Sequence, residues 1–103
     1  MEKVVYKYKL ENEAVQSLNL PMGAEFLTAD TQFTPDQFNP TSGSEDVYLW
    51  FLVPTDESVM KTKKIILVLP TGRKINDDKS NLKYLKTIFF KKVKEVYHIF
   101  ESE

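Results

Sequence analysis

The chain has 103 residues, of which 42% are hydrophobic and 13% aromatic, a composition typical of one packed domain spanning residues 1–103. It contains no cysteine, which excludes a disulfide framework and thiolate chemistry. The longest apolar runs, residues 47–53 and 65–69, are too short to cross a membrane. Charged residues occupy positions 2 and 3, where an export signal would need an apolar segment. We therefore expect a cytoplasmic protein with no membrane association.

The net charge of −1 conceals an asymmetry between the two halves of the chain. Residues 1–60 contain three lysines and ten acidic residues, whereas residues 61–103 contain eleven basic and five acidic residues. A basic half can indicate an anionic partner. The alternative is that acidic and basic strands pair within one sheet or between subunits. The sequence leaves both interpretations open.

The first half of the chain predicts three strands and a loop. Residues 4–10 alternate between apolar and polar side chains, the two-residue period of a half-buried strand. Residues 14–20 and 26–33 show weaker alternation, with the turn sequence "PMG" between them. Residues 34–46, "TPDQFNPTSGSED", are rich in turn-forming residues and have Phe38 as their sole large apolar side chain. We expect an exposed loop insertion there, acting either as a contact arm or as a mobile segment.

Two strongly apolar segments follow this loop. Residues 47–53, "VYLWFLV", are apolar on both sides of an extended chain, which predicts a central strand covered on both faces. Residues 61–69 end in "IILVL", rich in β-branched side chains, and predict a second central strand. The turn sequence "PTG" comes next, and then a polar connection in which Asp77 and Asp78 indicate a solvated turn.

The C-terminal segment, residues 82–101, fits two secondary structures. Apolar residues recur at spacings of three and four, as in an amphipathic helix. The same segment is rich in aromatic and β-branched residues, which favour strands at 82–90 and 94–101. Lys91 and Lys92 would then form the turn between them, although lysines are poor hairpin residues. Periodicity by itself does not choose between the helix and the hairpin.

Few residues in this chain could support catalysis. His98 is the sole histidine, so a zinc site or a catalytic triad would have to depend on it. We expect His98 to be a buried, hydrogen-bonded side chain instead. The segment "PTGRK" lacks P-loop spacing. Basic and aromatic residues alternate in "KYLKTIFFKK", but the lysines fall on both sides of a strand, so nucleic-acid binding is not favoured. We predict no enzyme, metal or cofactor.

Six segments together form a recognisable pattern: "YKYKL" (6–10), "LNLPMGAEFL" (18–27), "LWFLV" (49–53), "PTGRKI" (70–75), "LKYLKTIF" (82–89) and "VYHIFE" (96–101). This pattern resembles that of a family of short proteins of unknown function from tailed-phage and prophage genomes. The resemblance spans almost the whole chain in the same order. It implies a C-terminal hairpin, because the family has a glycine turn between its last two strands. It also implies a phage protein acting in the cytoplasm of its bacterial host.

This chain departs from the family pattern at several places. Lys9 replaces a proline, and Lys86 replaces a glycine. Pro70 and Arg73 stand where the family has Gly and His, so the family's histidine cannot be carried over to this loop. Residues 91–94 replace the glycine turn.

We predict an all-β domain of about six or seven strands, forming a small antiparallel sheet or sandwich, with a C-terminal hairpin rather than a helix. Because residues 47–53 need cover on two faces, we also predict a homo-oligomer. The leading functional hypothesis is a non-enzymatic phage accessory protein that counteracts host defence by sequestering a small anionic, nucleotide-type ligand. Arg73 would offer a bidentate fork to a phosphate, and Trp50 could stack on a base. The predicted ligand-binding residues are Thr71, Gly72, Arg73, Lys74, Trp50 and His98.

Three alternatives remain open at this point. The first is an interaction protein that inhibits a host bacterial protein through the loop at 34–46 and an exposed strand edge. The second is an accessory of virion assembly. The third is a weak enzyme that uses His98.

Overall fold

The structure, a computed structural model, describes residues 2–75 and 81–102. Over these residues it has seven strands and no helix, which confirms the all-β prediction. In chain order the strands are β1 (Lys3–Lys9), β2 (Val15–Pro21), β3 (Glu25–Pro35), β4 (Gly43–Pro54), β5 (Lys61–Pro70), β6 (Leu82–Phe89) and β7 (Val96–Ser102). The C-terminal hairpin is confirmed as the antiparallel pair β6–β7. Asp77 and Asp78, expected in a turn, lie outside the described residues.

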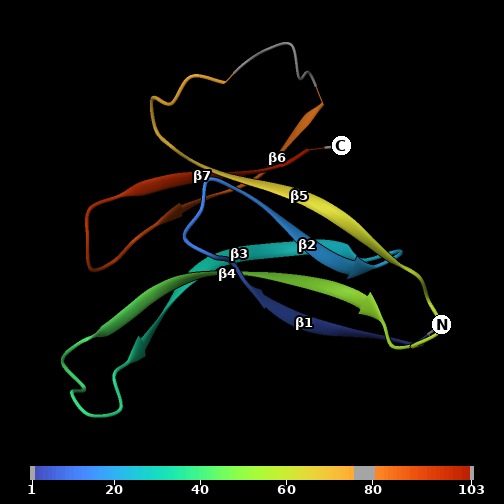
Figure 1. The fold of residues 1–103 in the computed structure, drawn as a ribbon, viewed down its shortest axis with the longest axis horizontal. Coiled ribbons are helices and arrows are strands. Elements are labelled where there is room, and N and C mark those ends of the chain that lie inside the picture. The colour runs from blue at the N-terminus through green and yellow to red at the C-terminus, as the bar shows by residue number, and fades with distance from the viewer. Residues whose placement is uncertain (1, 76–80, 103) are drawn as a thin grey trace.

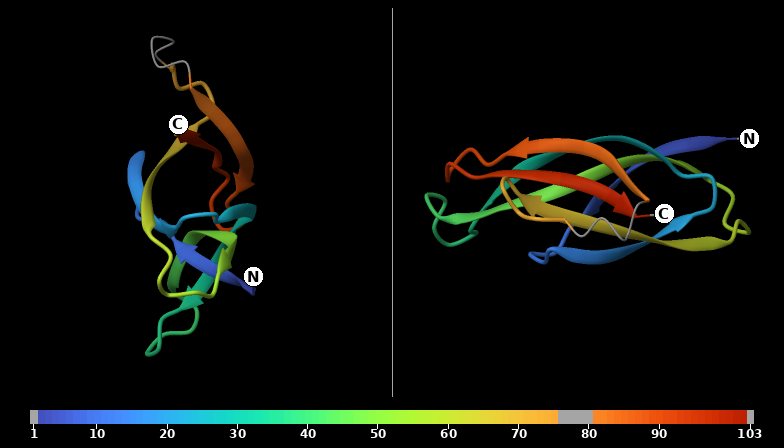
Figure 2. Two further views of the ribbon diagram at one scale, coloured as in Figure 1. Left: turned by 90° about the vertical axis from the view of Figure 1, so that its right-hand side faces the viewer. Right: turned by 90° about the horizontal axis from the view of Figure 1, so that it is seen from above.

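The strands form two antiparallel sheets. One has the order β1-β4-β3, and the other has the order β2-β5-β7-β6. Figure 1 shows the two sheets one above the other. In the right-hand view of Figure 2, the strands of both sheets are roughly aligned with the long axis of the molecule. The molecule is thin, with principal extents of 42 × 39 × 17 Å. As predicted, β4 is the middle strand of its sheet and β5 lies inside the other.

The core lies between the two sheets. Alternate residues of β4 point into it: Val47, Leu49, Phe51 and Val53 are all buried. They meet the inward side chains of the other sheet, above all Ile66, Ile88 and Ile99, and the remaining buried members of the core are Leu10, Leu20 and Ala29. Aromatic contacts extend the core, since Tyr8 and Phe26 each pack edge-on against Phe51 at a centroid distance of 5.7 Å.

One ion pair faces the interior of the sandwich. Glu101 of β7, which is 7% exposed, stands beside Ile66 in the sheet and pairs with Lys64 of β5. The Lys64 side chain is 35% exposed, so its ammonium group keeps some access to water. The pair joins two neighbouring strands at one end of the core.

The loop predicted at 34–46 is shorter in the structure. Strands β3 and β4 remain paired as far as Pro35 and Gly43, so only residues 36–42 connect them. The pairing depends on Gly43, because a Cβ atom there would lie 2.2 Å from the carbonyl oxygen of Thr34. The turn-forming residue types at positions 34–35 and 43–46 predicted a loop, whereas the structure places them at the ends of β3 and β4. Phe38, at the tip, is 88% exposed, as expected for an exposed loop.

The described part of the chain covers only one face of residues 47–53, which differs from the prediction. The inward side is buried by the other sheet, but Tyr48, Trp50 and Leu52 point outward and are half-buried. Part of their cover is a lysine: Lys7 Nζ lies 4.5 Å from the centre of the Tyr48 ring. Among the residues that the structure describes, none forms a second layer on the outer side of this apolar segment.

Candidate binding surface

The four-stranded sheet has an apolar outer side, which we call the four-stranded face. Strand register places on it the side chains that alternate with the core residues. Its apolar members come from all four strands: Val15, Ile65, Leu67, Leu69, Leu82, Tyr84, Phe89, Val96 and Phe100. None of them belongs to the core cluster between the sheets, although Leu69 is buried, at 7% exposed, and so is not part of the accessible surface.

The centre of this face carries no charge. Along the described strands, register puts charged side chains on this side only at Lys61 and Lys63, near the start of β5. Three apolar side chains are well exposed: Phe89 at 63%, Val15 at 57% and Tyr84 at 55%. An apolar patch that crosses a whole sheet and is bordered by polar groups is typical of an interaction site.

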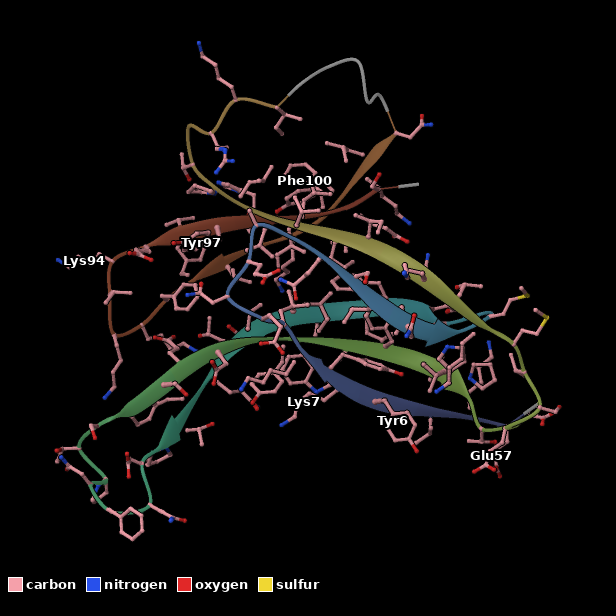
Figure 3. The ribbon with its side chains drawn as sticks, in the orientation of Figure 1. Tyr6, Lys7, Glu57, Lys94, Tyr97 and Phe100 are labelled. Atoms are coloured by element: carbon pink, nitrogen blue, oxygen red, sulfur yellow. The ribbon has the colours of Figure 1, made fainter. Side chains whose placement is uncertain are left out.

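One row across the face is built mainly from large side chains. Val15, Leu67, Phe100 and Tyr84 lie side by side on successive strands. The rings of Tyr84 and Phe100 pack edge-on with their centroids 5.8 Å apart. In Figure 3, Phe100 projects above the upper sheet, on the side where residues 71–75 rise, and Lys7 projects from the opposite side of the molecule.

A chain of hydrogen bonds fixes His98 on this face. Its Nε2 atom lies 2.7 Å from Thr71 Oγ1, and its Nδ1 atom lies 2.9 Å from Thr87 Oγ1. The Thr87 hydroxyl also meets the Tyr84 hydroxyl at 2.6 Å. As predicted, His98 is hydrogen-bonded, but it is only partly buried and lies on the outer face, which differs from the buried position that was expected. Its described partners are hydroxyl groups, so this arrangement is not that of a Ser-His-Asp triad.

The turn after β5 brings three of the predicted site residues together. The amide of Arg73 donates to the carbonyl of Pro70 at 3.2 Å, and Gly72 has a φ of +88°, which a type II turn requires. The turn places the Thr71 hydroxyl against His98, as described above. Arg73 and Lys74 follow it and are exposed.

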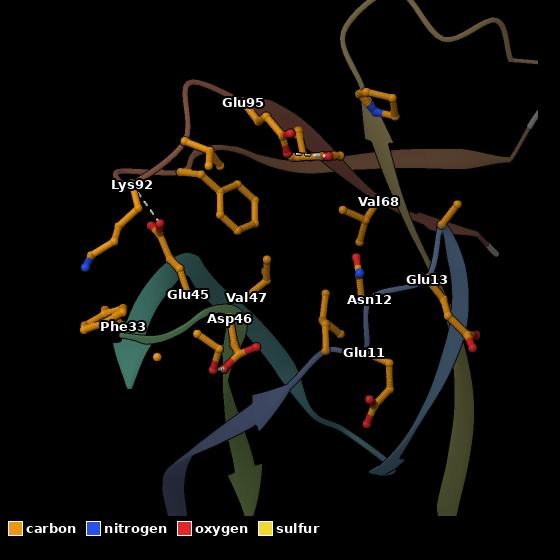
Figure 4. A pocket seen from close by; sticks show the side chains of 18 of the residues that line it. Glu11, Asn12, Glu13, Phe33, Glu45, Asp46, Val47, Val68, Lys92 and Glu95 are labelled. Carbon is orange, nitrogen blue, oxygen red and sulfur yellow. Dashed lines mark hydrogen bonds between the residues drawn. The ribbon is translucent and has the colours of Figure 1, made fainter. Parts of the chain in front are cut away.

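A cavity of about 660 Å³ opens at one end of the sandwich (Figure 4). Arg73 lies on its wall, and so do Lys92 and several apolar side chains. The wall is rich in acids, namely Glu11, Glu13, Glu45, Asp46 and Glu95. Negative charge around Arg73 lowers the affinity of this cavity for an anion.

Glu45 has a structural role in the cavity wall. Its carboxylate accepts hydrogen bonds from the backbone amides of Lys91 at 2.8 Å and Lys92 at 3.0 Å, and from Thr31 Oγ1 at 2.6 Å. Burial raises the pKa of Glu45, but these three hydrogen bonds and the nearby charge of Lys91 outweigh burial and leave the pKa below its ordinary value. The carboxylate thereby holds the β6–β7 turn against the β3–β4 hairpin.

Trp50, the remaining predicted site residue, lies apart from the others. It belongs to β4 and faces outward from the three-stranded sheet, whereas Thr71 and His98 lie on the outer side of the four-stranded sheet. The structure therefore brings together Thr71, Gly72 and His98, places Arg73 and Lys74 directly after them, and separates Trp50. A base stacked on Trp50 would lie on the outer side of the three-stranded sheet, away from Thr71 and His98.

Comparison with known proteins places the chain in a family. A model of the DUF7352 family, described as a domain of unknown function, matches residues 1–103. The chain belongs to this family. No curated protein and no solved structure matches it. Among residues 2–75 and 81–102, no helix could span a membrane, and no group of three or more His, Asp or Glu side chains could hold a metal ion.

Sequence reasoning missed the four-stranded face and Glu45. A signal for the face was present, because "IILVL" is apolar at both parities and therefore presents Ile65 and Leu67 opposite to Ile66. An apolar run of this kind predicts cover on both faces, and it does not say whether that cover comes from the same chain. Nothing local to Glu45 indicated its role, since its partners lie 46 and 47 positions further along the chain.

Proposed function

We propose that this protein is a non-enzymatic interaction protein that binds another protein through the four-stranded face. The observation that supports this most is the uncharged apolar surface across β2, β5, β7 and β6, with Phe89, Val15 and Tyr84 each more than half exposed. Aromatic side chains on such a surface are typical anchors of protein interfaces. Their backbone is held by paired strands, so little ordering is needed when a partner docks.

The charges near this face favour a partner with acidic groups around an apolar centre. Lys61 and Lys63 border the face at one end, and Arg73 and Lys74 lie on the connection that leaves β5 at the other. A partner with acidic side chains at both ends of its own apolar patch would meet opposite charges there. This arrangement gives the basic second half of the chain a role in steering a protein partner.

The resemblance to phage proteins suggests where such a partner would be found. We propose that the protein is a phage accessory that acts in the cytoplasm of the bacterial host, and that its partner is a host protein, for example one of the host's defence. This setting rests on the resemblance alone. The docking surface rests on the side chains described above.

Site-specific photo-crosslinking in bacterial cells tests the proposal. A photo-reactive amino acid at Tyr84 should crosslink to a partner protein, and the same group at Phe38, on the β3–β4 loop, should not. The purified partner should then form a complex that Phe89→Ser weakens about tenfold or more, as expected when an interface aromatic is truncated. Crosslinks that arise equally from both positions, or a complex insensitive to Phe89→Ser, would contradict the four-stranded face as the binding surface.

The small anionic ligand remains a second proposal. It is supported by the hydrogen bond between the Thr71 hydroxyl and His98 Nε2, 2.7 Å long. Thr71 lies two residues before Arg73 in the same turn. The acids around the neighbouring cavity disfavour it, and so does the distant position of Trp50. A thermal-shift panel of cyclic and ADP-ribose-type nucleotides is the direct test. A stabilisation that Arg73→Ala abolishes would favour the anion, whereas no stabilisation by any of them would remove it.

A further inference from the structure

The outer side of the three-stranded sheet, which we call the three-stranded face, has an ordered arrangement of side chains. Tyr48, Trp50 and Leu52 form its middle line along β4. Register places one residue of β1 and one of β3 beside each of them. From β1 through β4 to β3, the three rows are Lys9–Tyr48–Asp30, Lys7–Trp50–Thr28 and Val5–Leu52–Glu25.

Most charges on this face are separated by strand, and the exception is Asp46, which lies on β4 one row beyond Tyr48. Lys7 and Lys9 lie on β1, on one side of the apolar line, whereas Asp30 and Glu25 lie on β3, on the other side. Sequence order does not predict this separation, because all these residues belong to the acidic half of the chain. It arises because β4 inserts between β1 and β3 in the sheet.

The charges at the two ends of the first row are only loosely engaged within the chain. Lys9 Nζ lies 3.8 Å from Asp46 Oδ2, and the Lys9 side chain is 54% exposed. Asp30 Oδ1 lies 3.8 Å from Lys91 Nζ, and the Asp30 side chain is 59% exposed. Exposed ion pairs of this length are weak, so both charges are free to meet a partner surface.

We propose that two copies of the chain pack through this face about a two-fold axis parallel to β4. Such an axis turns one sheet onto the other and exchanges the two sides of the apolar line. Strand β1 of each copy then lies over β3 of its partner, and Lys9 lies opposite the partner's Asp30. Because a two-fold rotation does not shift positions along its axis, each row meets the same row of the other copy.

The charge pattern favours this axis over the second two-fold axis that could relate two such faces, which also lies parallel to the sheet. An axis perpendicular to the strands would place β1 over the partner's β1, and lysine would then meet lysine. With the axis along β4, two opposite-charge contacts form by symmetry. Tyr48, Trp50 and Leu52 meet their own counterparts at the centre, and so does Asp46 at the end of this line, where Lys9 of the same copy lies 3.8 Å from each Asp46 carboxylate. The dimer therefore supplies a second layer over residues 47–53, which the described residues of one copy do not provide.

The size of the face sets the expected strength of the dimer. Three strands at a spacing of about 4.8 Å make a narrow surface, smaller than the roughly 800 Å² per partner of a standard interface. We therefore expect a dimer that forms at micromolar rather than nanomolar concentration. This proposal uses a different face from the proposed function and is tested without any other partner.

A charge-exchange experiment tests both the dimer and its axis. By sedimentation at low salt, the wild-type chain should reach twice its 12.0 kDa mass. Lys9→Glu and Asp30→Lys should each weaken the homodimer about tenfold or more, because each creates two like-charge contacts by symmetry. An equimolar mixture of the two variants should dimerise again, since the new acid of one variant then meets the new base of the other, and the unchanged Asp30 meets the unchanged Lys9. The double variant in one chain should also recover.

Matched controls are Lys94→Glu and Glu57→Lys, which make the same charge changes at exposed positions on the β6–β7 and β4–β5 connections, outside the three rows of this face, and should leave the dimer unchanged. Thermal unfolding of each variant as a monomer separates weaker association from loss of the fold. The proposal is overturned if the wild-type chain stays monomeric up to about 100 micromolar, where a small interface should associate. It is also overturned if the mixture fails to dimerise, or if Lys9→Glu pairs with the wild type better than with Asp30→Lys.

Discussion

The carboxylate of Glu45 accepts a 3.0 Å hydrogen bond from the backbone amide of Lys92, a residue 47 positions further along the chain. The same carboxylate also binds the amide of Lys91. These contacts explain how the β6–β7 connection can close without the glycine expected of a tight hairpin turn. A side chain from another hairpin satisfies the amides of the turn, so the turn is supported by tertiary structure rather than by its own sequence.

Glu45→Ala should therefore destabilise the fold by about 1–3 kcal/mol, because it leaves two turn amides and the Thr31 hydroxyl without their acceptor. Chemical denaturation gives the free energy of unfolding directly. Glu25→Ala, at an exposed carboxylate in a long ion pair, is the matched control and should change stability by less than about 0.5 kcal/mol. Equal effects of the two substitutions would contradict the structural role of Glu45.

The same contacts predict a dependence of stability on pH. The pKa of Glu45 is lower in the folded chain than its ordinary value of 4.5. The contribution of Glu45 to the free energy of unfolding is therefore fully present above the pKa of the unfolded chain. This contribution is lost as the pH falls through the lower pKa of the folded chain. Wild type should lose stability below about pH 4.5 more steeply than Glu45→Gln. Parallel pH profiles for the two proteins would show that Glu45 is not the group responsible.

Two glycines should respond differently to alanine. Gly43→Ala places a Cβ atom 2.2 Å from the Thr34 carbonyl oxygen, so the ends of β3 and β4 must separate, at a cost of about 3 kcal/mol. Gly72 has a positive φ, but an added Cβ atom there would meet no other atom within 4 Å, so Gly72→Ala should cost only about 1–2 kcal/mol. Thermal unfolding of the two variants shows which substitution lowers the stability more. The reverse order would contradict the close approach at Gly43.

The two sides of the four-stranded sheet should tolerate substitution differently. Ile99 is fully buried between the sheets, and Ile99→Ala should destabilise the chain by about 2–5 kcal/mol. Phe89 is 63% exposed on the outer side, and Phe89→Ser should change the free energy of unfolding by less than about 0.5 kcal/mol. A large loss of stability in Phe89→Ser would indicate that this face is covered within the chain.

The inward ion pair of Lys64 and Glu101 should show strong coupling. Glu101→Leu leaves Lys64 facing the core without its partner, and we expect a loss of about 3 kcal/mol. Replacing both residues, as Lys64→Met with Glu101→Leu, should restore most of the stability, since an apolar pair fills the same space. A double-mutant cycle measures the coupling. Simply additive losses would contradict the contact.

Much of the local structure could be predicted from the sequence. Alternation predicted strands at residues 4–10, 14–20 and 26–33, and continuous apolar runs predicted the interior strands β4 and β5. These patterns succeed because side chains alternate across a strand and because interior strands exclude polar residues. The C-terminal segment was locally ambiguous, and the resemblance to a family with a glycine turn favoured the hairpin that the structure contains.

The sequence by itself determined that the chain forms strands up to residue 69 and that β4 and β5 lie inside the sheets, because side-chain period and β-branching act over a few neighbouring residues. Only the tertiary structure decided how the strands divide between two sheets, which apolar sides remain on the outside, and that Glu45 meets Lys92. An outward Leu67 and an inward Ile66 have the same apolar character, so their sequence cannot distinguish the core from a binding face. That distinction depends on pairings between residues far apart in the chain, which are settled when the two sheets pack together.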